Sequence, residues 1–226
     1  GSSNIVHLHL IVDTAGQQFF ERELLSLNVS CLRVSFHAFD SVCKLPNEAF
    51  LAKYNWQLSA HYSGVAGYCR IYLFDWFHKL GIDSIIAIES DQLFVQDVSK
   101  LWAEFARFGK DAVMGLPELY KPWREGRSTV PAADPAGAAR RIAARNIEDD
   151  EQGGTRAYRR RHNGYIGGIV MLNLTRMSAL APSWDGVMHA SLDTFLAKEW
   201  QTDPDWTLEM NDQDVINAMA EVRPEL

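Results

Sequence analysis

The sequence has no excess of positive charge and no long hydrophobic run, and each absence excludes a class of function. The formal net charge is −7 and the isoelectric point is about 5.5, which argues against a general surface for nucleic acids or other polyanions. No apolar run reaches the length that spans a bilayer. We therefore expect neither a nucleic-acid partner nor a transmembrane segment. A nucleotide whose phosphates are neutralised by a metal ion stays compatible with this charge.

Cysteine is also scarce. The three cysteines, Cys31, Cys43 and Cys69, have no metal-ligand spacing and are too few for the disulfide framework of a small secreted domain. One disulfide with one free thiol and three buried thiols are both compatible with their number. Two glycosylation sequons, at Asn28 and Asn173, permit a secretory-pathway context without demanding it.

The length of 226 residues suits one α/β domain, which we assign to residues 4–226. The opening Gly1-Ser2-Ser3 is typical of the remnant of a cleaved tag and is left out of the fold. Residues 117–161 are rich in Pro, Ala, Arg and Asp. This change of composition predicts a variable surface insertion whose charge runs are solvated.

Hydrophobic patterns predict alternating strands and helices. Residues 5–12, 17–27 and 31–36 read as strand, helix and strand, the opening of a βαβ unit. Residues 64–80 predict a largely buried helix, 84–88 a buried strand, and Ser99 the N-cap of a further helix. A short strand at 112–116, a glycine-rich strand at 164–174 and helices near 187–199 and 211–220 complete the pattern.

The most informative motif is the acidic end of the strand at 84–88, where Glu89, Ser90 and Asp91 follow an apolar run. Because strand side chains alternate between faces, we expect Glu89 and Asp91 to point to one side and Ser90 to the other. The carboxyl ends of strands are where open α/β sheets bind ligands. Paired carboxylates near a core are usually compensated by a hard cation, although a solvated strand end is the alternative.

A second acidic group, Asp212 and Asp214, begins a predicted helix. Capping of the helix explains one of these acids but not both. If the sheet brought them close to the strand-end pair, three or four carboxylates would need a divalent cation. Arg70, on the helix before the acidic strand, is either a second positive charge for a phosphate or the partner of one of these acids in a structural ion pair.

Taken in order, these motifs resemble the family 8 retaining glycosyltransferases, which have the GT-A fold. The chain resembles the LARGE-type and glucoside xylosyltransferase branches most. The resemblance implies a Rossmann-like, nucleotide-sugar-binding α/β domain with a mixed, mostly parallel central sheet flanked by helices. The segments that carry it are His9–Asp13, His61–Gly67, Leu93–Trp102, Val170–Met177 and Asp212–Asn217, together with Tyr68, Cys69 and Arg70.

This resemblance implies a metal-dependent enzyme that transfers xylose or another sugar from a UDP-sugar to a glycan or glycoprotein acceptor, with retention at the anomeric carbon. It also implies Mn²⁺ as the usual metal and the Golgi or ER lumen as the location. The implied metal ligands are Glu89 and Asp91. The implied donor-binding residues are His9, Ile11, Val12, Asp13, Arg70, Glu89, Ser90 and Asp91. The implied catalytic residues are Asp212, Gln213 and Arg70.

Three departures from the family pattern leave an alternative open. Glu89 stands where the family has Asp, Ile166 where it has Asn, and the late metal-binding His segment is not found before Leu226. The C-terminal part of the family domain is therefore expected to be absent. These departures favour a catalytically weak or inactive relative that binds a nucleotide sugar or a glycan. A nucleotidylyltransferase ranks last, because residues 13–16 hold a single glycine where a phosphate loop needs several.

Overall fold

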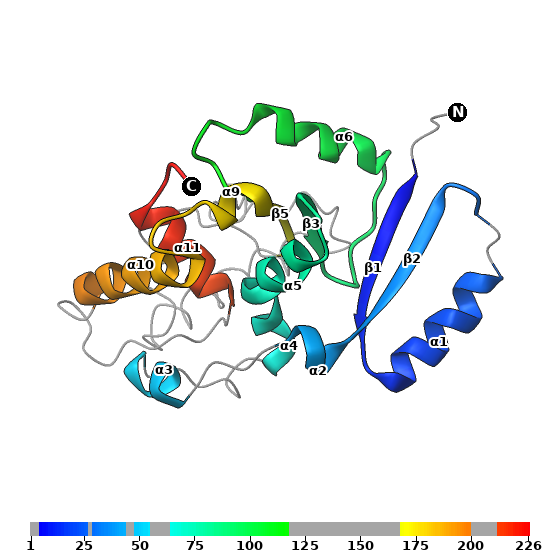
Figure 1. The fold of residues 1–226 in the computed structure, drawn as a ribbon, viewed down its shortest axis with the longest axis horizontal. Coiled ribbons are helices and arrows are strands. Elements are labelled where there is room, and N and C mark those ends of the chain that lie inside the picture. Colours follow the sequence, from blue (N-terminus) through cyan, green and yellow to red (C-terminus); the bar gives the residue numbers. More distant parts are fainter. Residues whose placement is uncertain (1–4, 27–28, 44–47, 55–63, 118–167, 200–211) are drawn as a thin grey trace, which may run out of the picture.

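The computed structural model describes residues 5–26, 29–43, 48–54, 64–117, 168–199 and 212–226. The predicted βαβ opening is confirmed: strand β1 (Val6–Val12), helix α1 (Thr14–Leu25) and strand β2 (Leu32–Ala38) follow in order (Figure 1). The two strands pair in parallel from Val6 opposite Leu32 to Val12 opposite Ala38. The predicted insertion at 117–161 lies outside the described residues except for Pro117.

The turn from β1 into α1 is fixed by a helix cap. The side chain of Asp13 accepts a hydrogen bond of 2.7 Å from the backbone N–H of Gly16. This bond satisfies one of the N–H groups that a helix start leaves without a partner. A Cβ at Gly16 would lie 3.1 Å from that same Asp13 oxygen. Glycine therefore suits the close approach of the cap.

The predicted buried helix at 64–80 is confirmed, although it is interrupted. Helix α4 (Gly64–Cys69) passes through the 3-10 helix η1 (Arg70–Tyr72) into helix α5 (Leu73–Lys79). Tyr68, Ile71 and Phe77 are buried. Two short helices, α2 (Phe39–Val42) and α3 (Glu48–Lys53), come before this segment. Arg70 thus lies on a segment whose neighbours are anchored in the core.

A second described sheet lies at the centre of Figure 1 and has the order β3-β5-β4. Strand β5 (Ile169–Asn173) pairs antiparallel with both β3 (Ser84–Ile88) and β4 (Met114–Gly115). Among the described strands, only the pairing of β1 with β2 is parallel. The mixture of directions was expected, but the antiparallel share is larger than the sequence predicted.

The remaining helices of the described residues are α6 (Val98–Trp102), η2 (Ala103–Arg107), α9 (Leu174–Ser178), α10 (Trp184–Glu199) and α11 (Asp212–Val222). The prediction that Ser99 caps α6 is wrong. The cap is Asp97, whose carboxylate accepts a 2.9 Å bond from the backbone N–H of Ser99. A carboxylate two residues earlier reaches this N–H while the Ser99 backbone is already helical.

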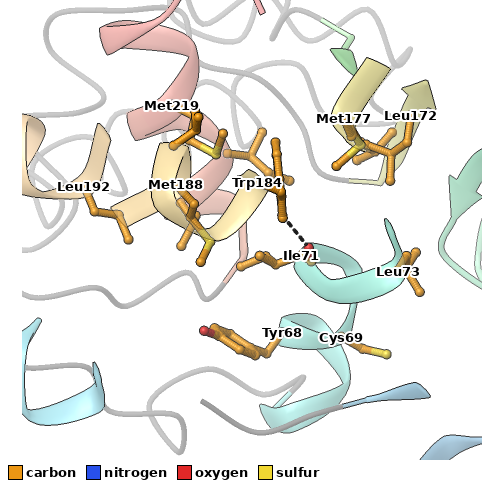
Figure 2. Close-up of a cluster of buried hydrophobic side chains, with 14 of the residues drawn as sticks. Tyr68, Cys69, Ile71, Leu73, Leu172, Met177, Trp184, Met188, Leu192 and Met219 are labelled. Atoms are coloured by element: carbon orange, nitrogen blue, oxygen red, sulfur yellow. Dashed lines mark hydrogen bonds between the residues drawn. The ribbon is translucent and has the colours of Figure 1, made fainter. Parts of the chain in front are cut away.

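The core forms where α10 and α11 pack against the α4–α5 segment (Figure 2). Trp184 is buried, and its indole N–H donates a 3.0 Å hydrogen bond to the carbonyl of Ile71. Met188, Leu192 and Met219 are also buried in this cluster. The indole therefore fills core volume and also satisfies a carbonyl one residue beyond Arg70.

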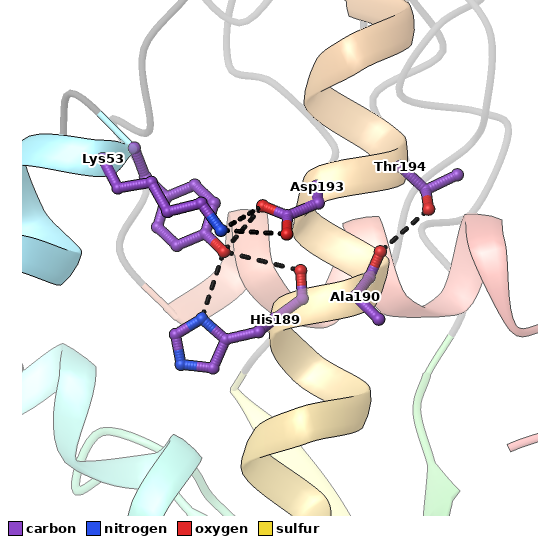
Figure 3. Close-up of polar contacts among 6 residues, drawn as sticks. Lys53, His189, Ala190, Asp193 and Thr194 are labelled. Atoms are coloured by element: carbon purple, nitrogen blue, oxygen red, sulfur yellow. Dashed lines mark hydrogen bonds and ion pairs between the residues drawn. The ribbon is translucent and has the colours of Figure 1, made fainter. Parts of the chain in front are cut away.

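A polar cluster docks α3 and the following residue onto α10 (Figure 3). The hydroxyl of Tyr54 lies 3.1 Å from Nδ1 of His189 and donates a 2.9 Å bond to Asp193. Lys53 forms an ion pair of 2.7 Å with the same carboxylate. Tyr54 is buried, so its hydroxyl needs these partners. The cluster therefore joins two segments that lie far apart in the sequence.

The structure decides between one disulfide with a free thiol and three buried thiols, the two arrangements that the number of cysteines allowed. Cys43 and Cys69 form a disulfide, and Cys31 is an exposed free thiol. The disulfide joins the end of α2 to the residue directly before Arg70. Within the described residues, no helix is both long and apolar enough to cross a membrane.

Candidate functional site

The acidic motif lies on a turn rather than on the strand. Strand β3 ends at Ile88, which pairs with Ile169, and the N–H of Glu89 donates a 3.0 Å bond to the carbonyl of Gly168. The N–H of Gln92 then returns to the carbonyl of Glu89 at 3.3 Å. The expectation that strand alternation orients Glu89 and Asp91 together is therefore wrong, because the chain turns after the last ladder bond.

Arg70 lies between two carboxylates that are far apart in the sequence. Its Nη2 lies 3.0 Å from Oε1 of Glu89, and its Nε lies 2.6 Å from Oδ2 of Asp212. Nη2 also donates a 3.2 Å bond to Oδ1 of Asp212. The exposed fractions of the side chains are 15% for Arg70, 41% for Glu89 and 3% for Asp212. The structure therefore brings together three of the predicted site residues, which we call the Arg70 triad.

The buried member of the triad has a perturbed proton affinity. Burial raises the pKa of Asp212 to about 6, Arg70 opposes this shift, and Glu89 adds to it. Although Oδ2 lies close to Nε of Arg70, it accepts no aligned hydrogen bond from any described residue. A buried carboxylate oxygen with unused acceptor capacity is suited to a ligand hydroxyl or a bound cation.

A glycine keeps space beside the acidic turn. A Cβ at Gly168 would lie 3.2 Å from the amide nitrogen of Gln92 and 3.5 Å from Oε2 of Glu89. A side chain at this position would crowd the Gln92 amide and lie in van der Waals contact with Glu89. The glycine-rich segment predicted close approach of a backbone or a ligand, and at Gly168 the close neighbour is the acidic turn itself.

The other predicted acids differ in exposure. Asp91 is exposed on the turn, and its carboxylate accepts a 3.4 Å bond from Gln92. Asp214 is buried in the first turn of α11, and Gln213 is half-buried beside it. Among the described residues, no group of three or more His, Cys, Asp or Glu side chains could hold a metal ion. A cation would therefore take one or two carboxylates here and complete its shell with substrate oxygens and water.

The predicted donor-binding residues on and directly after β1 contact neighbouring parts of the protein. Nδ1 of His9 lies 2.9 Å from Nε2 of His37, and the indole N–H of Trp76 donates a 3.2 Å bond to Nδ1 of His37. Because an indole can only donate, His37 must carry its proton on Nε2, and this N–H donates a hydrogen bond to Nδ1 of His9. Ile11 and Val12 are half-buried, and Asp13 caps α1. Their role in donor binding stays a prediction.

The burial of His9 beside two other histidines predicts a pH-dependent stability. Burial, and then the neighbouring His7 and His37, lower the pKa of His9 from 6.5 to about 4. Between these values the unfolded chain binds a proton that the native protein does not, so the free energy of unfolding falls as the pH is lowered. Urea unfolding at several pH values measures this slope. A His9→Gln variant with the same slope between pH 4 and 6.5 would contradict the assignment.

The described elements form an α/β domain in which an acidic turn follows β3 and an arginine lies between two carboxylates. The chain is similar to the Xylosyl- and glucuronyltransferase LARGE2s of Gallus gallus, at 23% identity over 223 residues, which are 99% of this chain and 25% of that protein. It is 29% identical to the human Xylosyl- and glucuronyltransferase LARGE1 over 123 residues, which are 54% of this chain and 15% of that protein.

A solved structure shows the same fold. Mouse Xyloside xylosyltransferase 1, in its apo form, matches with a TM-score of 0.63 and 19% identity over 98% of this chain and 70% of that chain. The predicted GT-A fold and the predicted relationship to LARGE-type transferases are thus confirmed. No protein-family model matches the sequence. The chain spans about a quarter or less of the length of these curated relatives.

Two features that support the site were not found from the sequence. One is the disulfide at Cys69, and the other is the hydrogen bond from Trp184 to Ile71. Both lie directly beside Arg70 in the chain or in space. The adjacency of Cys69 and Arg70 was visible, but the partner of a cysteine cannot be deduced from spacing alone.

Proposed function

We propose that this domain is a metal-dependent retaining glycosyltransferase that uses a UDP-sugar. The observation that carries the proposal is the Arg70 triad at the end of β3, with the exposed carboxylate of Asp91 on the same turn. One guanidinium and two accessible acids beside the carboxyl end of β3 support this proposal, because open α/β sheets bind ligands outside the carboxyl ends of their strands. The transferase names of its relatives support the same reaction class.

The residues have distinct proposed roles. Asp91 supplies a carboxylate for Mn²⁺, and Glu89 binds the metal or the ribose, with Ser90 between them on the donor-binding turn. His9, Ile11, Val12 and Asp13 line the uracil pocket. The metal would supply Lewis-acid stabilisation of the departing diphosphate. Arg70 adds a positive charge close to the same phosphates or the donor sugar. Asp212 and Gln213 face the donor sugar from the start of α11.

The acceptor we propose is a glycan or a glycoprotein in the Golgi or ER lumen. The disulfide between Cys43 and Cys69 supports an oxidising compartment. The sequon at Asn173 adds little, because Asn173 is half-buried at the end of β5 and its side chain caps α9 by accepting a 3.0 Å bond from the N–H of Arg176. Xylose, a different pentose or a hexose is the proposed sugar.

Titration of UDP with and without Mn²⁺ tests this proposal. We expect UDP binding that requires Mn²⁺ and is lost in Asp91→Asn, because the amide removes a ligand charge from the metal. Asp111→Asn is the matched control, since Asp111 is also exposed but lies on the loop before β4. A wild-type protein that binds no UDP under either condition would overturn the donor site.

A second candidate is a relative that binds a nucleotide sugar without transferring it. Its support is the ion pair between Glu89 and Arg70, which occupies a carboxylate that the metal would use. Release of UDP from a panel of UDP-sugars separates the two candidates, because a transferase leaks donor slowly to water. Mn²⁺-dependent UDP binding without any hydrolysis or transfer would favour the binding relative.

A further inference from the structure

We propose that Glu89 is a switching residue, which pairs with Arg70 in the ligand-free site and exchanges Arg70 for the divalent cation when the donor binds. This inference rests on the proposed function and adds an order of events to it. The cation and the guanidinium compete for one carboxylate. Binding of the cation therefore releases an N–H group of Arg70, which can then bind the diphosphate or the sugar.

The two carboxylates of the triad are unequal in a way that decides which of them is exchanged. Asp212 is 3% exposed and contacts both Nε and Nη2 of Arg70, whereas Glu89 is 41% exposed and contacts Nη2. A buried, doubly contacted pair is costly to break because it leaves an uncompensated charge. A half-exposed pair contributes little. Arg70 therefore keeps Asp212 and releases Glu89.

The side-chain length of Glu89 makes the pairing feasible. The backbone of Glu89 is held by its N–H bond to the carbonyl of Gly168, and its side chain extends from this fixed point to Arg70 at 3.0 Å. An Asp at this position would be shorter by one methylene. It would be drawn away from the guanidinium and left available on the turn beside Asp91.

Exchange of this kind links the affinities for the two ligands. In the ligand-free protein the guanidinium opposes a cation at Glu89, which weakens cation binding in the absence of a diphosphate. A diphosphate offers Arg70 a new anionic partner and so removes the competition. By reciprocity, the cation then strengthens diphosphate binding by the same factor. The site thereby disfavours the metal alone and favours the metal with its donor.

Mn²⁺ affinity without UDP, followed through the EPR signal of the free ion, tests the exchange. We expect Glu89→Asp and the double variant Arg70→Met/Asp212→Asn to bind Mn²⁺ about five-fold tighter than the wild type, as loss of a competing ion pair at a half-exposed site predicts. The double variant removes one charge of each sign, so the net charge of the site is unchanged. Adding Glu89→Gln to it should abolish the gain.

The outcomes separate this inference from the proposed function. If the wild type binds UDP with Mn²⁺ but neither variant binds Mn²⁺ more tightly, the exchange is overturned and the donor site stands. If the wild type binds no UDP with Mn²⁺, the proposed donor site is overturned. Absence of Mn²⁺ binding in all of these proteins, with native circular dichroism, would overturn both.

Discussion

Replacing Arg70 with methionine is expected to lower the free energy of unfolding by about 3–5 kcal/mol at pH 8, the cost of removing one partner of a buried ion pair. Asp212 is 3% exposed and would be left as a buried carboxylate without its cation. Its pKa is already raised to about 6 by burial, and loss of Arg70 raises it further. Urea unfolding measures the loss.

The pH dependence of this variant follows from the same carboxyl group. Because the native pKa of Asp212 lies above its unfolded value of 3.8, the native state binds more protons between the two values. The stability of Arg70→Met should therefore recover as the pH falls from 8 toward 5. A loss of stability that is equal at pH 8 and pH 5 would contradict a buried charge as its cause.

A second substitution isolates the charge from the packing. Asp212→Asn in the Arg70→Met background removes the unpaired carboxylate, and we expect it to restore most of the lost stability. Arg70→Lys keeps the charge but cannot reach both Oδ atoms with a planar fork. Its cost should be intermediate. A double variant no more stable than Arg70→Met would show that the guanidinium acts through packing alone.

The elements of the fold could be predicted because their signals are local. The apolar run of β3, the helical spacing of α1 and the buried stretch from α4 to α5 all depend on residues within one or two turns of chain. The end of β3 is different. The strand ends where its pairing with β5 ends, and the last hydrogen bond before the turn goes from the N–H of Glu89 to the carbonyl of Gly168. No local sequence pattern at Glu89 contains that information.

The candidate site was predicted only in part, because the pairing of its residues also depends on contacts that no local sequence pattern contains. The sequence named Arg70, Glu89 and Asp212 and left open whether Arg70 pairs with an acid. The structure supplies the pairing, with Glu89 exposed and Asp212 buried. That difference in exposure follows from the packing of α11 against α4 and η1, a tertiary contact between segments that are far apart in the sequence. The hydrogen-bonded row from Trp76 to His9 is likewise tertiary, since its members come from three elements.

The largest effect expected of a residue outside the site comes from Trp184. Trp184→Ala should lower the free energy of unfolding by about 3–5 kcal/mol, the usual cost of truncating a buried aromatic side chain. It opens a cavity against Met188 and Met219 and leaves the carbonyl of Ile71 without its donor (Figure 2). Chemical denaturation monitored by circular dichroism gives the value.

Trp184→Phe separates these two contributions. Phenylalanine keeps most of the apolar volume but cannot donate, so the variant should lose only about 1–3 kcal/mol for a buried carbonyl left unpaired. Because Ile71 follows Arg70 within η1, this loss should be accompanied by weaker UDP binding in the presence of Mn²⁺. If Trp184→Phe unfolds at the wild-type urea concentration and binds UDP as tightly, the indole bond does not support Arg70. The anchoring would then reside in the apolar packing of α10 alone.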